Sequence, residues 1–284
     1  MSIKKVGVVG AGTMGNGIAQ VCAAAGVPVA MLDVNQAALD RGLATVRQSL
    51  ERLVAKGKLS APERDAVLER IRPTLSQADL ADADLLIEAA TENEELKLKL
   101  LAQLDEVLGP QALIASNTSS ISITRLAAAT RRPDRFIGMH FFNPVPVMAL
   151  VELIRGVQTS DATHAAAAAF VQQIGKHPIT VRNSPGFVVN RILCPMINEA
   201  FMVLGEGLAS AEDIDEGMKL GCNHPIGPLA LADLIGLDTM LAVMEVLHAQ
   251  FGDPKYRPAL MLRELVAAGR LGRKSGWGVY RYAK

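Results

Sequence analysis

The sequence predicts an α/β protein with a mainly parallel sheet, an inserted helical hairpin and an all-helical C-terminal domain. Short apolar runs occur at 6–9, 29–32, 85–89 and 113–115. Longer amphipathic segments separate these runs, and this alternation is typical of βαβ units with parallel strands. After Asn183 the sequence changes to helical patterns punctuated by turns. We therefore expect two domains, residues 1–183 with the sheet and residues 184–284 with helices alone.

The composition is that of a globular protein without a charge bias. Of the 284 residues, 50% are hydrophobic and 20% are charged, and Lys+Arg and Asp+Glu both number 29. No excess of positive charge therefore points to nucleic acid or to an anionic membrane surface. We also find no apolar stretch of about 20 residues that would span a bilayer, and no signal-peptide pattern. These observations favour a cytoplasmic protein.

The three cysteines do not form a recognisable framework. Cys22, Cys194 and Cys222 are odd in number, widely spaced and embedded in apolar stretches. Disulfide scaffolds and zinc sites have regular, paired spacings instead. We expect buried thiols in a reducing compartment and no metal site.

A helical hairpin is predicted between the second and third apolar runs. Five apolar residues recur there at steps of four and three: Leu39, Leu43, Val46, Leu50 and Leu53. This spacing marks a long helix with one apolar face. A second helix is expected to begin near Ser60, which can cap it, with Pro62 in its first turn. The two helices would form an insertion in the connections of the sheet.

The first apolar run leads into a glycine-rich turn that predicts a Rossmann-type nucleotide site. Gly10, Gly12 and Gly15 form G-x-G-x-x-G between a predicted strand and a predicted helix. The first glycine permits a tight turn, the second a close approach of a pyrophosphate, and the third close packing of helix on strand. Thr13 and Met14 open the helix, whose N-terminal N–H groups favour anions. An ordinary strand-to-helix turn is the alternative.

Asp33 makes NAD the predicted cofactor. It ends the second apolar run, 18 residues after Gly15 (33 − 15). A carboxylate there accepts hydrogen bonds from the adenosine ribose hydroxyls and repels a 2′-phosphate, which favours NAD over NADP. A competing interpretation makes Asp33 a cap for the helix that starts near Asn35.

His140 is the candidate general base for a hydride transfer from a secondary alcohol. Such a reaction needs a group that takes the hydroxyl proton, and neutral histidine suits it. His140 ends a strand-like run, 136–139, and precedes a proline-fixed turn, 141–146. Glu152, in the next apolar run, could bond the second ring nitrogen, fix the tautomer and stabilise the imidazolium. The alternative, in which His140 is an ordinary buried histidine without a catalytic role, remains open at this point.

Hydroxyl and amide groups that could hold the substrate oxygen lie at two further places. Ser119 and Ser120 follow the run 113–115 and should lie at the carboxyl edge of the sheet, where ligands of such sheets bind. Asn190 lies about one turn into the helix that follows Pro185 and Gly186, and its side chain could donate as well. Both Ser119 and Asn190 could instead serve as helix caps or packing polar groups.

Three longer motifs carry a resemblance to a known family. They are the segments Ser116–Ser120, His140–Pro146 and Pro185–Arg191. Over essentially its whole length the chain resembles the 3-hydroxyacyl-CoA dehydrogenases, most closely the bacterial enzymes that act on 3-hydroxybutyryl-CoA. The resemblance implies oxidation of a short (S)-3-hydroxyacyl-CoA by NAD. It further implies that His140 is the general base paired with Glu152, and that Ser119 and Asn190 position the 3-oxygen.

The resemblance also implies ligand contacts. It places several residues at or near NAD: Glu92, Lys97, Asn117, Ser119, Asn143 and Lys274. In the family the inserted hairpin receives the CoA moiety, and four basic residues here could meet its phosphates: Arg47, Arg52, Lys56 and Lys58. We assign Lys56 to the substrate; a solvated basic face accounts for such charges equally well. Trp277 departs from the family pattern, because relatives more often carry a polar residue at that position.

Two other classes of protein could have the expected layout, namely other dehydrogenases and non-catalytic proteins. Dehydrogenases of the 3-hydroxyisobutyrate or 6-phosphogluconate type share the expected layout but use a lysine on the long helix, where this chain has Asn190 and Arg191. A non-catalytic, crystallin-like protein would not require Ser119, His140, Glu152 and Asn190 together.

The segments 192–204 and 229–247 carry more apolar residues than one face of a small bundle needs. A homodimer interface or a well-filled core would account for them.

Overall fold

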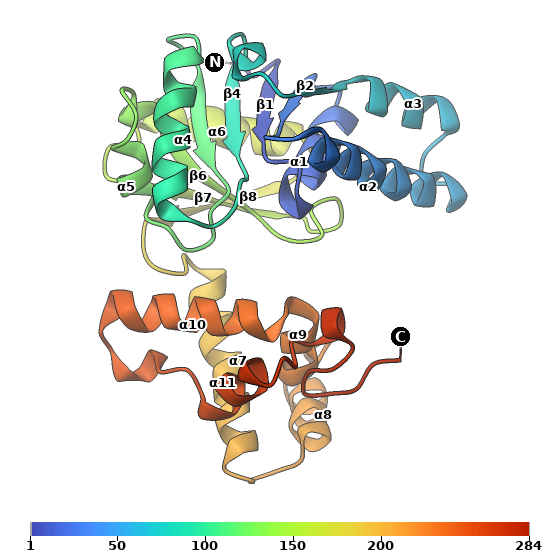
Figure 1. The fold of residues 1–284 in the computed structure, drawn as a ribbon, viewed down its shortest axis with the longest axis vertical. Coiled ribbons are helices and arrows are strands. Elements are labelled where there is room, and N and C mark those ends of the chain that lie inside the picture. The colour runs from blue at the N-terminus through green and yellow to red at the C-terminus, as the bar shows by residue number, and fades with distance from the viewer. Residues whose placement is uncertain (1, 284) are drawn as a thin grey trace. The chain divides into compact units, whose positions relative to one another are not determined.

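The computed structural model describes residues 2–283, and the chain divides after Asn183 into two compact units (Figure 1). The first unit contains one eight-stranded sheet in the order β3-β2-β1-β4-β5-β6-β7-β8. Its strands are β1 (Val6–Val9), β2 (Val29–Leu32), β3 (Ile71–Thr74), β4 (Leu85–Glu88), β5 (Leu113–Ser116), β6 (Phe136–Phe141), β7 (Leu150–Arg155) and β8 (His177–Arg182). The predicted α/β class is confirmed.

Strand direction divides the sheet into two parts. Strands β1 to β6 run parallel, as predicted. Strand β7 pairs antiparallel with β6, and β8 pairs parallel with β7, so the last two strands are reversed. The order reverses between β1 and β4, and in open sheets of this kind ligands bind at the carboxyl ends of the strands at such a switch point.

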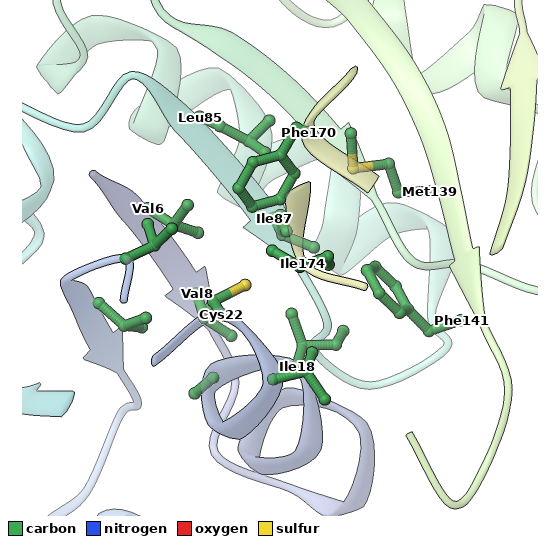
Figure 2. Close-up of a cluster of buried hydrophobic side chains, with 14 of the residues drawn as sticks. Val6, Val8, Ile18, Cys22, Leu85, Ile87, Met139, Phe141, Phe170 and Ile174 are labelled. Atoms are coloured by element: carbon green, nitrogen blue, oxygen red, sulfur yellow. The ribbon is translucent and has the colours of Figure 1, made fainter. Parts of the chain in front are cut away.

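Helices cover both faces of this sheet. They are α1 (Thr13–Ala24), α2 (Gln36–Ala55), α3 (Ala61–Glu69), α4 (Glu94–Val107), α5 (Ile123–Ala127) and α6 (Asp161–Gln173). Apolar residues of α1 and α6 pack with alternate residues of the strands in one buried core. Figure 2 shows ten of them: Val6, Val8, Ile18, Cys22, Leu85, Ile87, Met139, Phe141, Phe170 and Ile174.

This packing decides which way the end of β6 faces. Met139 and Phe141 belong to the core under α1 and α6. Because side chains alternate along a strand, Gly138 and His140 face the other side. There a Cβ on Gly138 would stand 2.9 Å from the side chain of Ile123 in α5. A glycine at 138 therefore lets α5 pack directly on the strand that carries His140.

The hairpin predicted between β2 and β3 is formed by α2 and α3, which project side by side from the sheet (Figure 1). Asn35 caps α2 by accepting from the Ala38 N–H at 2.8 Å. Ser60 and Glu63 form a reciprocal capping box at the start of α3, with Pro62 in the first turn. Both helix starts thus have the polar caps that orphan N–H groups require.

The second unit consists of helices and turns. Its helices are α7 (Val189–Gly205), α8 (Ala211–Cys222), α9 (Pro228–Ile235), α10 (Leu237–Phe251) and α11 (Leu260–Ala267). Two buried carboxylates, Asp215 and Asp233, organise it: Asp215 accepts from two N–H groups at the start of α9, and Asp233 accepts from the Val279 and Tyr280 N–H groups. The bonds to Asp233 hold the C-terminal segment with Val279 and Tyr280, here called the tail, against helix α9.

The structure shows the surroundings of Trp277 and of the three cysteines. Trp277 lies between the guanidinium groups of Arg270 and Arg281, at 3.6 and 4.4 Å from its ring centroid, so it stabilises the tail through cation–π contacts. The prediction of three buried thiols is wrong for Cys222, which is exposed at the last position of α8. Burial raises the pKa of Cys22 and of Cys194 to about 12. Within residues 2–283, no helix is both long and apolar enough to cross a membrane.

Candidate functional site

The glycine-rich turn lies at the carboxyl end of β1 and leaves room for a ligand. Gly10 has φ +99°, and a Cβ there would stand 2.6 Å from the Ala89 carbonyl oxygen. A Cβ on Gly15 would stand 1.7 Å from the Gly10 carbonyl oxygen, so this residue permits the close helix-to-strand turn. A Cβ on Gly12 would meet nothing within 4 Å. Gly12 is also the N-cap of α1 and provides no side-chain cap. Gly12 and the helix N-terminus thus fit a pyrophosphate.

Asp33 belongs to this turn and does not cap α2. Its Oδ2 accepts from the Ala11 N–H at 2.8 Å, and its Oδ1 accepts from the Val34 N–H at 2.7 Å. The capping interpretation is wrong, because Asn35 performs that task. The carboxylate lies at the end of β2, half-buried beside the glycine turn. This is the position from which an acid meets an adenosine ribose.

His140 and Glu152 form a buried pair across two strands. They are direct register partners in the antiparallel β6–β7 pair, so their side chains lie on one face. His140 Nδ1 lies 2.7 Å from Glu152 Oε2, and the two side chains are 8% and 0% exposed. The ring of Phe142 packs at 4.5 Å from the imidazole centroid. A carboxylate at this position accepts from the Nδ1–H and so favours the tautomer that carries its proton on Nδ1.

The segment after β5 is tied to the strand of the histidine. Asn117 Oδ1 accepts from the Phe141 N–H at 2.9 Å, immediately beyond His140. The Asn117 N–H in turn donates to the Glu88 carbonyl at 2.7 Å. Hydrogen bonds of Asn117 therefore connect the ends of β4, β5 and β6 at the carboxyl edge of the sheet. Asn117 positions this edge whether or not it also contacts NAD.

One carboxylate oxygen of Glu92 accepts hydrogen bonds from residues 118–120, which we call the Ser119 segment. Glu92 Oε1 accepts from the Thr118 hydroxyl at 2.5 Å, from the Ser120 hydroxyl at 3.0 Å and from the Ser119 N–H at 2.9 Å. The Ser119 hydroxyl lies 3.4 Å away, at the limit of hydrogen bonding. Thr118 and Ser120 thus commit their hydroxyl protons to Glu92. Of the three hydroxyls that donate to Glu92, that of Ser119 makes the longest bond and is the most readily turned toward a substrate.

The surroundings keep Glu92 ionised. Partial burial alone would raise its pKa, but the charge of Lys97 and the hydrogen bonds from residues 118–120 hold the pKa below its usual value. Lys97 itself is only 1% exposed and lies between Glu88 and Glu92. Its contact with NAD, predicted from the resemblance, stays a prediction.

Two predicted site residues belong to the helical unit. Asn190 lies half-buried in the first turn of α7, whose N-cap is Val188, so Asn190 does not cap the helix. Lys274 pairs with Asp238 at the start of α10, at 2.6 Å. Ser119 is likewise no cap, since Ser122 caps α5. The alternative roles as helix caps are wrong for Ser119 and Asn190.

The hairpin bears the predicted CoA contacts. Lys56 is exposed at the C-terminal end of α2, and Arg47, Arg52 and Lys58 are exposed nearby. A hollow of about 380 Å³ lies between α1, α2 and α3, and its lining includes Gln20, Leu50 and Arg70. Among the residues that the structure describes, no cluster of three His, Cys, Asp or Glu could hold a metal.

Sequence reasoning missed Glu88, Ser116 and Thr118. Glu88 ends the apolar strand β4 and is fully buried, with bonds from the Ser116 hydroxyl at 2.6 Å and the Ala90 N–H at 2.7 Å. An acid that closes an otherwise apolar run at the carboxyl edge was the available signal. Its burial depends on Lys97 in the next helix, and a single sequence does not reveal such a pairing.

Comparison with known proteins identifies the class. Residues 5–184 match the NAD binding domain of 3-hydroxyacyl-CoA dehydrogenase, and residues 186–282 match the C-terminal domain of the same enzyme. The chain belongs to the 3-hydroxyacyl-CoA dehydrogenase family. Its cofactor is NAD, as the glycine turn and Asp33 predict, and the rival dehydrogenase families are set aside.

Individual relatives cover the chain end to end. A 3-hydroxybutyryl-CoA dehydrogenase of Bradyrhizobium diazoefficiens is 55% identical over 99% of this chain and 96% of its own length. A probable 3-hydroxybutyryl-CoA dehydrogenase of Deinococcus radiodurans is also 55% identical, over 98% and 100%. The crystal structure of (S)-3-hydroxybutyryl-CoA dehydrogenase PaaH1 from Ralstonia eutropha superposes with a TM-score of 0.97 at 69% identity and full coverage of both chains.

Proposed function

We propose that the protein interconverts (S)-3-hydroxybutyryl-CoA and acetoacetyl-CoA with NAD, and that His140 is its general base and acid. The observation that carries this proposal is the buried His140–Glu152 pair at the carboxyl edge, in the same unit as the nucleotide-binding turn. The names of the full-length relatives support the substrate.

His140 moves the proton of the reaction. When bound, NAD accepts the hydride from C3 of the alcohol. Because Nδ1 is engaged by Glu152, the hydroxyl proton passes to Nε2 of His140. The Glu152 carboxylate stabilises the imidazolium that results, and in the reverse direction the imidazolium returns the proton to the new alkoxide.

Other residues bind and orient. The Ser119 hydroxyl, which is held by Glu92 only through a 3.4 Å bond, turns to donate to the 3-oxygen, where negative charge grows in the reduction direction. Asn190 contributes its amide to the same oxygen. Gly12, Thr13 and Met14 receive the pyrophosphate at the start of α1, and Asp33 receives the ribose. The remaining NAD contacts that we propose are Glu92, Lys97, Asn117, Ser119, Asn143 and Lys274.

The hairpin receives the CoA moiety in this proposal. Lys56 and its basic neighbours on α2 are exposed, and phosphates at neutral pH attract such charges. Interactions of this kind weaken with salt, so the KM for the CoA substrate should rise with ionic strength.

We also propose a cytoplasmic homodimer built through the helical unit. Several apolar side chains of that unit are exposed: Ile192, Leu208, Leu220, Leu234 and Leu260. Scattered apolar residues need no partner, but five large ones on about a hundred residues favour an interface. Light scattering after gel filtration should give twice the chain mass of 30.2 kDa. A measured mass equal to that of one chain would refute the proposed dimer.

A steady-state comparison tests the reaction. Acetoacetyl-CoA and longer 3-ketoacyl-CoA substrates are each assayed with NADH and with NADPH. We expect the highest kcat/KM with acetoacetyl-CoA and NADH. The proposal fails if no CoA thioester supports oxidation of NADH.

A further inference from the structure

The turn that follows the strand of His140 is held by a lysine from a later part of the chain. Lys176 lies between α6 and β8, and its Nζ donates to the Val145 carbonyl at 2.6 Å and to the Met148 carbonyl at 2.7 Å. Within the turn, the Met148 N–H donates to the Pro144 carbonyl at 3.0 Å. One ammonium group therefore binds two carbonyls of residues 144–148, which we call the clamped turn.

The partners of the Lys176 ammonium are carbonyls rather than a carboxylate. Across residues 2–283, Lys176 takes part in no salt bridge. The side chain is half-buried, and burial lowers its pKa because the charged form loses hydration. Hydrogen bonds from a charged donor are stronger than those between neutral groups. This lysine therefore gives up hydration for two charge-assisted bonds to a single turn, which points to a specific role for that contact.

Further contacts hold the clamped turn and its surroundings. Val145 is 2% exposed and belongs to the core of the first unit. A Cβ on Gly17 of α1 would stand 2.9 Å from the Val145 Cβ, so the glycine lets the turn pack directly on this helix. Immediately after Lys176, the His177 N–H donates to the Ala149 carbonyl at 2.8 Å. The clamped turn is thus fixed by α1 and by the start of β8.

Asn143 directly precedes the clamped turn. Its side chain is exposed, and in the described part of the chain its amide makes no hydrogen bond that would hold it. The direction of this amide therefore depends on where the backbone lies. On one side of Asn143, β6 ends at Phe141, whose N–H donates to Asn117 at 2.9 Å. On the other side lies the clamped turn, so the bonds of Lys176 help to decide where Asn143 lies.

We propose that Lys176 is a positioning residue for Asn143: its two bonds hold the clamped turn in the place from which Asn143 reaches NAD. This inference rests on the proposed contact between Asn143 and NAD. Lys176 acts through the backbone of the turn. Its loss should therefore weaken cofactor binding only where Asn143 is present to make the contact.

A double-mutant cycle between Lys176 and Asn143 tests the proposal. Wild type, Lys176→Met, Asn143→Ala and the double variant are compared by the Kd for NADH from fluorescence titration. Asn143→Ala should raise the Kd about tenfold, as loss of one good contact does. Lys176→Met should raise it about fivefold or more in the wild-type background and less than about twofold beside Asn143→Ala, because residues that act through one contact are not additive. Amide hydrogen exchange in the clamped turn should also become faster in Lys176→Met.

Two control variants separate positioning from a general loss of stability. Asp105→Asn weakens the bonds from Arg131 and Arg132 to the end of α4, so it should lower the melting temperature and leave the Kd for NADH unchanged. Lys99→Met removes an exposed lysine and should change neither quantity. If Lys176→Met does not fold, Lys176→Gln replaces it in the cycle with the same expectations, since its amide keeps a neutral donor.

The possible outcomes distinguish this inference from the proposed function. An equal rise of the Kd for NADH in both Asn143 backgrounds would refute the positioning role alone. So would an unchanged Kd in the Lys176 variant while Asn143→Ala weakens binding, or a Kd raised as much by Asp105→Asn. An unchanged Kd in Asn143→Ala would remove Asn143 from the proposed NAD contacts, and the inference with it.

Discussion

The Glu152→Gln substitution is the most informative change in the catalytic pair. Glutamine has nearly the same volume as glutamate, and Glu152 is fully buried in β7, so the packing is kept while the negative charge is lost. The lost component is the charge assistance of a 2.7 Å bond to His140 Nδ1. Hydrogen bonds to charged groups contribute about 1.5–3 kcal/mol. At about 1.4 kcal/mol per factor of ten, kcat should fall roughly 10- to 150-fold.

The assay is the oxidation of NADH by acetoacetyl-CoA at saturating concentrations of both. The Kd for NADH should stay within about twofold of wild type, because no cofactor contact changes. Glu69→Gln makes the same chemical change at an exposed position on α3 and should leave kcat unaltered. Wild-type kcat in a folded Glu152→Gln protein would refute the reasoning that this carboxylate stabilises the imidazolium.

Four further expectations follow from the geometry. Gly12→Ala adds a methyl group in open space, so the melting temperature should hold while the Kd for NADH rises about tenfold or more; an unchanged Kd would remove the pyrophosphate from this position. Gly15→Ala places a Cβ 1.7 Å from a carbonyl oxygen and should lower both the melting temperature and NADH binding, as thermal melts and titration would show. Asp33→Ala should relax the preference for NADH over NADPH in kcat/KM, and an unchanged ratio would limit Asp33 to holding the glycine turn. The buried carboxylate of Asp105 in α4 accepts from Arg131 and Arg132. Burial alone would raise the pKa of Asp105, but the bonds from these two arginines lower it. Its contribution to stability is therefore present above the unfolded pKa of about 3.9 and is lost as the pH falls through the folded value. Asp105→Asn should therefore cost about 1–3 kcal/mol at neutral pH by denaturant titration, and the difference should shrink below about pH 4; a constant difference would contradict this.

Much of the first unit could be predicted because its strands are short, apolar and bounded by helical patterns. The runs 6–9 and 29–32 coincide with β1 and β2, and the cap at Ser60 and the place of Pro62 in the first turn of α3 are confirmed. The reversal of β7 could not be predicted, because side-chain alternation in Leu150–Arg155 is the same for either strand direction. Direction is decided by how the connection after β6 packs.

Some residues of the candidate site could likewise be predicted from local sequence, whereas the positions of others depend on tertiary contacts. Gly10, Gly12 and Gly15 follow from local backbone demands, which a sequence displays directly. The facing of His140 and Glu152 depends on β6–β7 register, which comes from tertiary pairing. Contacts among Glu88, Glu92, Lys97 and the Ser119 segment join three separate elements. Their burial follows from the assembled sheet edge, so composition and spacing gave no sign of it.

The most direct test of the central claim is the rate at which acetoacetyl-CoA oxidises NADH with the wild-type protein and with His140→Ala. The claim predicts steady consumption of NADH by the wild type and a kcat at least about a hundredfold lower in the variant, the lower end of general acid–base contributions. The variant should still bind NADH with unchanged Kd, since His140 is not among the proposed cofactor contacts. Equal turnover in the two proteins would contradict the account.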